Sequence, residues 1–304
     1  MQYQNTFHSF EDAHGPLPYN MTNDYLFRAV LQRNNFVLCG LIRSLLHIPK
    51  EVSVEAEITN PIVLGDSISD KEIRLDISLI LNRSTLINLE MQVVNRFNWK
   101  ERSLTYLCRS FDQLEHGDDY SDIKPVIHIG FLDYTLFDDA PEFYASYMLM
   151  NVKNHRIYSD KFNLRVVDLN QTELATDEDK AYHIDYWAQL FKSTTWEELH
   201  MLAEKDEYIS EATKAIFQVT TDAQEQKLLH DRREYNNDVR YYNKQIQLLK
   251  EARQDIASQK QVIDEQRQDI AEKDKALDEK DRALEKLSEE IAALKAKLTA
   301  SDNN

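Results

Sequence analysis

Two stretches in the first third of the chain alternate strictly between apolar and polar side chains, which is the pattern of strands with one buried face. Every second residue is apolar in residues 73–79 and again in residues 87–93. Residues 82–84 between them read Asn-Arg-Ser, a turn composition, so the two runs predict a β-hairpin. A turn centred on Arg83 places the polar side chains of both strands on one face, in three opposed pairs: Arg74 with Gln92, Asp76 with Glu90, and Ser78 with Asn88.

The residues before the hairpin predict a helix and a strand. Apolar residues recur at helical spacing from Leu26 to Leu45. This spacing predicts one helix that begins at the N-cap residues Asn23 and Asp24 and runs to about Leu46. Residues 51–58 then alternate as a strand does.

A second helix and two further strands are predicted after the hairpin. Residues 125–132 are continuously apolar, as in a strand buried on both faces, and residues 162–169 alternate as an outer strand does. The order of helices and strands predicts an α/β core. The second helix has an apolar stripe with Arg102, Tyr106 and Arg109 on another side; the stripe consists of Leu104, Leu107, Cys108, Phe111 and Leu114.

The C-terminal part of the chain is charged and helical from about Asp177. Neither Gly nor Pro occurs after Pro141, so nothing interrupts a long helix beyond Gln224. Every seventh residue of this helix is aliphatic, which predicts a coiled coil: Leu249, Ile256, Ile263, Ile270, Leu277, Leu284, Ile291 and Leu298. Polar residues fill half of the seam before the last two heptads. The tail is therefore interpreted either as a homo-oligomeric coiled coil or as a lone charged helix.

Composition limits which partners the chain can have. The net charge is −17, and residues 1–180 already carry 17 basic against 27 acidic residues, which opposes non-specific attraction to phosphates. A protein that acts on DNA would therefore need a local basic patch, a metal ion or a partner. No apolar run is long enough for a membrane span, residues 1–20 do not resemble a secretory signal, and Cys39 and Cys108 lie apart. These features predict a cytoplasmic protein without a structural zinc site.

The placement of the Asp76 and Glu90 carboxylates opposite one another needs a physical explanation. Directly opposed side chains on a sheet have Cβ atoms about 4.5–5.5 Å apart, where like charges are destabilising. A divalent cation such as Mg²⁺ supplies that reason, because it prefers oxygen ligands and can activate a water for attack on a phosphodiester. Gln92 points to the same face and could hold that water. The alternative is a solvated polar sheet face.

The hairpin also resembles a known motif. Residues 74–76 and 88–92 read Arg-Leu-Asp and Asn-Leu-Glu-Met-Gln, and they resemble the D…ExQ form of the PD-(D/E)XK nuclease signature. More narrowly, from about residue 20 to about 245 the chain resembles the Rpn-type recombination-promoting nucleases, also described as PD-(D/E)XK nuclease-family transposases. The supporting segments are residues 23–28, 102–107, 117–126 and 232–235.

The resemblance implies a restriction-endonuclease-like core with a helical extension and a coiled coil. It also implies cleavage of double-stranded DNA with Mg²⁺ or Mn²⁺, in recombination or mobile elements. By the motif match, Asp76 and Glu90 become metal ligands, and Gln92 takes the catalytic place of the signature lysine. Because glutamine is neutral, this departure bears directly on the expected rate. Asp24 matches a family acidic position, for which capping of the first helix is the alternative.

The sequence leaves two questions about the site and the function open. Arg102 and Tyr106 could contact DNA phosphates from the second helix, or they could belong to a solvated helix face. The chain could be a Mg²⁺-dependent DNA endonuclease, or it could be a catalytically weak or inactive nuclease fold that serves as a DNA-binding or scaffolding module. The predicted domains are a nuclease-like domain (1–175), a helical extension (176–225) and a coiled coil (226–304).

Overall fold

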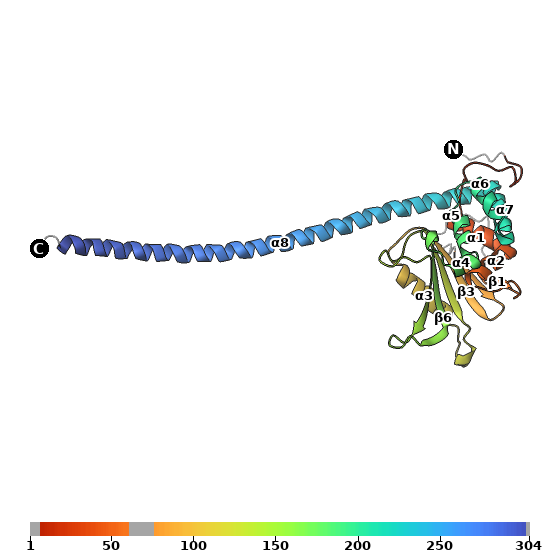
Figure 1. The fold of residues 1–304 in the computed structure, drawn as a ribbon, viewed down its shortest axis with the longest axis horizontal. Helices are drawn as coiled ribbons and strands as arrows, with labels where there is room; N and C mark the ends of the chain where they lie inside the picture. The colour runs from red at the N-terminus through yellow and green to blue at the C-terminus, as the bar shows by residue number, and fades with distance from the viewer. Residues whose placement is uncertain (1–6, 61–75, 302–304) are drawn as a thin grey trace. The chain divides into compact units, whose positions relative to one another are not determined.

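A computed structural model describes residues 7–60 and 76–301 of the protein (Figure 1). Residues 1–240 form one compact unit and residues 241–304 form a second. Within the described residues, six strands make one mixed sheet in the order β1-β2-β3-β4-β6-β5. Helices cover this sheet, so the prediction of an α/β core is confirmed. No helix in the described ranges combines the length and the apolar character that crossing a membrane requires.

The hairpin forms with the predicted register. Strands β2 (Ile77–Leu81) and β3 (Thr85–Gln92) are antiparallel, and Ser78 pairs with Asn88 while Ile77 pairs with Leu89. Asn82 and Arg83 adopt positive φ angles of 47° and 58°, which allow the tight reversal between the strands. Asp76 lies directly before β2, next in register to Glu90. The predicted partner of Gln92, at position 74, lies outside the described residues.

The centre of the sheet is parallel. Strand β4 (Val126–Leu132) lies between β3 and β6 (Ile157–Asp168), is parallel to both, and is buried along its whole length, as predicted. The prediction of an outer strand at residues 162–169 is wrong, because β5 (Tyr144–Met150) pairs beyond β6 and forms the edge. Most of β5 is exposed on both faces, so it lacks the alternation that identifies a strand.

The single N-terminal helix of the prediction is two helices. Helix α1 (Asp24–Arg33) ends and α2 (Asn35–Leu45) begins at Asn34, whose backbone is extended at φ −122° and ψ 95°. The Asn34 side chain accepts hydrogen bonds from the backbone N–H groups of Phe36 and Val37, so it caps the second helix. The predicted strand at residues 51–58 is also shorter, since β1 covers Ala56–Ile58 alone.

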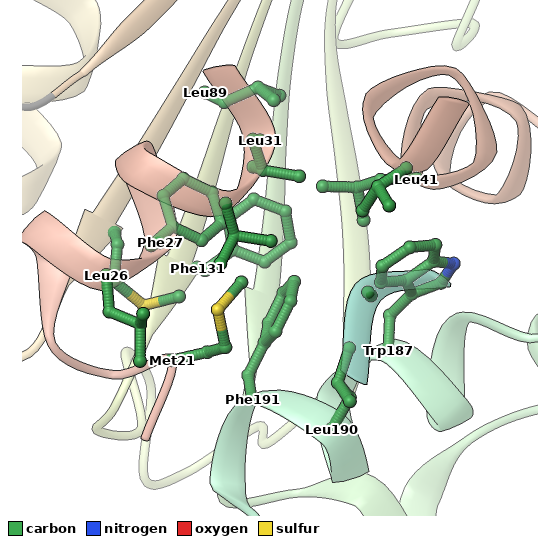
Figure 2. Packing of buried hydrophobic residues seen from close by; sticks show 14 of the residues in the cluster. Met21, Leu26, Phe27, Leu31, Leu41, Leu89, Phe131, Trp187, Leu190 and Phe191 are labelled. Carbon is green, nitrogen blue, oxygen red and sulfur yellow. The ribbon is translucent and has the colours of Figure 1, made fainter. Parts of the chain in front are cut away.

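The main core lies on one face of the sheet. Helices α1, α2, α5 (Ile184–Lys192) and α7 (Glu207–Thr221) pack there against apolar residues of β2, β3 and β4. The rings of Phe27, Phe131 and Phe191 lie 5.3–5.6 Å apart in this core, beside Trp187 and Leu89 (Figure 2). Because side chains alternate along a strand, the polar residues of β3 point to the opposite face.

Helix α3 (Trp99–Phe111) covers that opposite face. Trp99, Ser103 and Leu107 are its buried residues, whereas Leu104 and Cys108 are exposed, so the predicted apolar stripe is wrong. Trp99 packs over Gly130 of β4, where an added Cβ would lie 2.1 Å from the indole ring. The helix therefore approaches the sheet through Trp99, Ser103 and Leu107 rather than through the whole predicted stripe.

The remaining helices are largely in the C-terminal half. Short helices α4 (Asp177–Ala181) and α6 (Trp196–Ala203) pack with α5 and α7, and 3-10 turns occur at Tyr120–Asp122 and Thr172–Leu174. Helix α8 (Ala223–Ser301) begins with the buried residues Leu228 and Leu229. Residues 251–293 of α8 are exposed, including the heptad residues Ile256, Ile263, Ile270, Leu277, Leu284 and Ile291.

Candidate active site

A row of polar residues crosses the sheet beneath α3. Ser78 on β2, Asn88 on β3 and His128 on β4 are direct neighbours in the strand register. The Ser78 hydroxyl donates to Asn88 Oδ1 at 3.1 Å, and Asn88 Nδ2 donates to His128 Nδ1 at 2.9 Å. An amide nitrogen is a donor, so His128 Nδ1 accepts and the ring proton is on Nε2. The row therefore fixes the tautomer of a buried imidazole.

His128 directs this Nε2–H toward Glu90. The His128 side chain is fully buried, and its Nε2 lies 3.7 Å from Glu90 Oε2. Neither atom has a hydrogen-bond partner among the described residues. Burial, with the charge of Arg102 as the second cause, lowers the pKa of His128 to about 3, so the imidazole is neutral.

Glu90 is the buried carboxylate of the site. Its side chain is 5% exposed, and Oε1 accepts a hydrogen bond from Arg102 Nε at 2.7 Å. Burial raises the pKa of Glu90 to about 6, because Arg102 offsets only part of the desolvation and the charges of Asp76 and Asp24 oppose ionisation. The carboxylate is ionised above this pKa, and among the described residues only Oε1 has a hydrogen-bond partner.

Asp76 is held beside Glu90 through its backbone. Arg28, fully buried on α1, donates to the carbonyl oxygens of Asp76 and Asn60, and Asn60 Nδ2 also donates to Asp76 O at 3.1 Å. Ser78 N in turn donates to Asn60 Oδ1 at 2.8 Å. Burial lowers the pKa of Arg28 to about 10, so it stays charged. These bonds anchor the start of β2 in the hairpin register.

Gln92 follows on the same face of β3. Its Nε2 donates to the carbonyl of Val94 at 2.8 Å, which orients the side chain. The amide oxygen is then the group that can accept a hydrogen bond from a water. Tyr134, from the segment after β4, is close enough for the charge of Glu90 to raise its pKa, although burial is the larger cause of that rise.

Asp24 does not cap helix α1. Asn23 is the N-cap of α1, and its Oδ1 accepts from Tyr25 N and Leu26 N. The capping interpretation of Asp24 is therefore wrong. Asp24 is buried and paired with Arg232 of α8, whose Nε donates to Oδ1 at 2.6 Å. It acts on Glu90 through its charge.

Arg102 and Tyr106 belong to the site itself. Arg102 binds Glu90, lies 5.2 Å over the Tyr106 ring and donates to its hydroxyl at 3.4 Å. The Tyr106 ring stacks on His128 with centroids 5.9 Å apart. The interpretation of Arg102 as part of a solvated face is therefore wrong, whereas Arg109 is exposed.

His128 is a site residue that the sequence pattern did not single out, and its Nε2 has no hydrogen-bond partner among the described residues. The available signal was one polar residue within an otherwise apolar strand. Arg28 was missed altogether. The corresponding signal in the sequence was an arginine among the apolar residues of the first helix, and the structure shows this arginine to be buried.

The residues present fit a divalent cation. Glu90 Oε2 is a buried carboxylate oxygen without a partner in the described parts of the chain, and the charge of Asp76 reaches it. Magnesium is commonly bound by one or two carboxylates, with waters and substrate phosphates as the other ligands. Within residues 7–60 and 76–301, no group of three His, Cys, Asp or Glu side chains forms a cluster able to hold a metal ion.

The mixed α/β fold, with one six-stranded sheet covered by helices, is that of a PD-(D/E)XK nuclease family domain. The family model described as PD-(D/E)XK nuclease family transposase matches residues 21–245. The chain belongs to this family, which confirms the resemblance and suggests nuclease chemistry linked to transposition. Comparisons with curated proteins and with solved structures gave no match.

Proposed function

We propose that the protein is a metal-dependent DNA endonuclease that hydrolyses phosphodiester bonds in transposition or recombination. The observation that carries the proposal is the buried, ionised Glu90, whose Oε2 has no hydrogen-bond partner among the described residues while Asp76 lies next to it in register. A carboxylate oxygen left unpaired in a buried site costs free energy unless something binds it. A divalent cation carried with the DNA phosphate would bind it.

Asp76 and Glu90 would hold the cation, which would be Mg²⁺ or Mn²⁺. When bound, the cation polarises the phosphodiester and makes a water more acidic. Gln92 would accept a hydrogen bond from the attacking water through its amide oxygen and so orient it. Because glutamine carries no positive charge, the site lacks the charge stabilisation that a lysine would give at this position.

Arg102 and His128 position Glu90. Arg102 fixes Oε1 through a charge-assisted hydrogen bond, and the tautomer of His128 turns an N–H toward Oε2. Residues that orient a metal ligand in this way commonly change metal affinity 10- to 100-fold when removed. Tyr106 closes the site by stacking on His128. A phosphate contact of Arg102 or Tyr106 remains part of the proposal.

The test is plasmid nicking by the full chain with Mg²⁺ or Mn²⁺, beside Asp76→Ala and Glu90→Ala. Cleavage by the wild type that both variants lose is the expected result. Glu57→Gln, an exposed acidic position on β1, is the matched control and should cleave normally. Cleavage that persists in the Asp76 and Glu90 variants would place the chemistry elsewhere.

One observation favours a second function, a catalytically weak or inactive nuclease fold that binds DNA or serves as a scaffold. The residue at the lysine position is neutral, and its amide nitrogen is bonded to Val94. Calorimetry separates the two functions, because only the enzyme requires Mn²⁺ binding that disappears in Asp76→Ala. In either case we expect the heptads of α8 to join copies of the chain into a homo-oligomer.

A further inference from the structure

A pocket of about 280 Å³ lies between the N-terminal segment 17–23 and the first part of α8. From α8, its wall is formed by Arg233, Asn236, Asn237 and Arg240. Counted from Arg233, the other three residues lie three, four and seven positions further along the chain. This spacing places all four on one face of the helix. The two arginines are about 10 Å apart along the helix axis, a separation that their long side chains can bridge.

The pocket has a charge opposite to that of the chain. The chain carries a net charge of −17, yet none of the described side chains that line the pocket is acidic and two of them are arginines. The depression at the end of α3 shows the contrast, since Asp112, Glu115 and Asp118 line it. The pocket is therefore a local basic patch of the kind that an acidic protein needs to approach DNA.

The contacts of the four pocket residues of α8 leave polar groups exposed in the pocket. Asn236 is buried and donates to Asp24 at 3.4 Å, which ties this face of α8 to α1. Arg233 lies 4.9 Å over the half-buried ring of Tyr19 and 3.8 Å from the exposed Glu234. Arg240 and Asn237 are exposed. Guanidinium and amide N–H groups are among the donors that bind phosphate oxygens in protein–DNA complexes.

The pocket adjoins the candidate active site. Asn236, in the pocket wall, donates to Asp24, whose charge acts on Glu90. Asn23, also in the wall, precedes Asp24 on α1. A DNA strand whose phosphodiester lies at Glu90 would thus have neighbouring phosphates near α8.

We propose that this pocket binds a backbone phosphate of the DNA duplex next to the phosphodiester at Glu90, through Arg233, Arg240 and Asn237. The proposal rests on the proposed function, because it takes DNA to be the substrate. It assigns a role to residues 232–235, in which Arg232 holds Asp24 and Arg233 faces the phosphate.

Fluorescence anisotropy of a labelled DNA duplex, measured in EDTA over a range of salt concentrations, tests the proposal without cleavage. Arg233→Gln and Arg240→Gln should each weaken binding about tenfold at low salt. Each should also reduce the slope of log K against log salt by about 1, because one phosphate contact is lost. Asn237→Lys should tighten binding, a result that misfolding cannot produce.

The matched control is Arg253→Gln, an exposed arginine further along α8, which should leave the slope unchanged. Variants of Arg233 and Arg240 that bind with the wild-type slope, an equal loss in Arg253→Gln, or no duplex binding by the wild type would each overturn the pocket assignment. Plasmid cleavage is measured on the same samples. Binding that depends on the two arginines without cleavage by the wild type would keep the pocket and remove the nuclease proposal.

Discussion

Glu90→Gln should stabilise the metal-free protein at neutral and alkaline pH. Burial raises the pKa of Glu90 from 4.5 to about 6, and each pKa unit corresponds to about 1.4 kcal/mol. The ionised Glu90 therefore costs about 2 kcal/mol of folding free energy above pH 6. Glutamine has nearly the same shape and no charge, so it removes this cost.

The sign of the pH dependence follows from the raised pKa. Between pH 4.5 and 6 the folded state binds more protons at Glu90 than the unfolded state does, so the wild type loses stability as pH rises through this window. The gain from Glu90→Gln should accordingly be about 2 kcal/mol at pH 8 and less than about 1 kcal/mol at pH 5.

Urea denaturation followed by tryptophan fluorescence measures both values. Trp99, Trp187 and Trp196 are all buried in the compact unit of residues 1–240, so they report its unfolding. Glu57→Gln, exposed on β1, is the control and should show no gain that depends on pH. A Glu90→Gln variant that is no more stable than the wild type at pH 8, or equally stabilised at pH 5, would refute the reasoning. Added Mn²⁺ should stabilise the wild type and not Glu90→Gln.

Three further changes test other parts of the molecule. Gln92→Lys should increase the rate of plasmid nicking, because the ammonium group adds positive charge beside the phosphate; an unchanged rate would show that Gln92 is not at the reacting centre. His128→Leu should weaken Mn²⁺ binding at least about tenfold in calorimetry, whereas Ser78→Ala, at the far end of the polar row, should have a smaller effect. Ile263→Asn should lower the mass of the protein in sedimentation equilibrium by weakening the heptad seam, and an unchanged mass would exclude this helix as the oligomer interface.

The sequence by itself determined the hairpin and, with it, the pair of acidic residues. The side-chain period of a strand is two, and the turn at residues 82–84 fixes how two short runs oppose one another. Both are local properties, so the register of Ser78 with Asn88 could be predicted correctly. The long uninterrupted α8 was predictable for the same reason, since helix breakers are absent after Pro141.

The helix boundaries and the strand order depend on side-chain contacts that the spacing of apolar residues in the sequence does not predict. The apolar spacing passes through Asn34 without a break, and only the cap that its side chain forms divides α1 from α2. Strand β6 became an interior strand because β5 covers its second edge, although β5 is too exposed to be recognised. The stripe on α3 was misjudged because Trp99 can pack on the sheet where Gly130 leaves room.

Only the tertiary structure decided the surroundings of Glu90. The parallel pairing of β3 with β4 brings His128 to Asn88 across 40 residues of sequence, and α3 crosses the same face to bring Arg102. Burial, which raises the pKa of Glu90 and lowers that of His128, exists only when those elements have packed together. Residue type and spacing therefore determined which acidic groups face one another. Non-local packing determined that Glu90 Oε1 pairs with Arg102 and that Oε2 has no hydrogen-bond partner among the described residues.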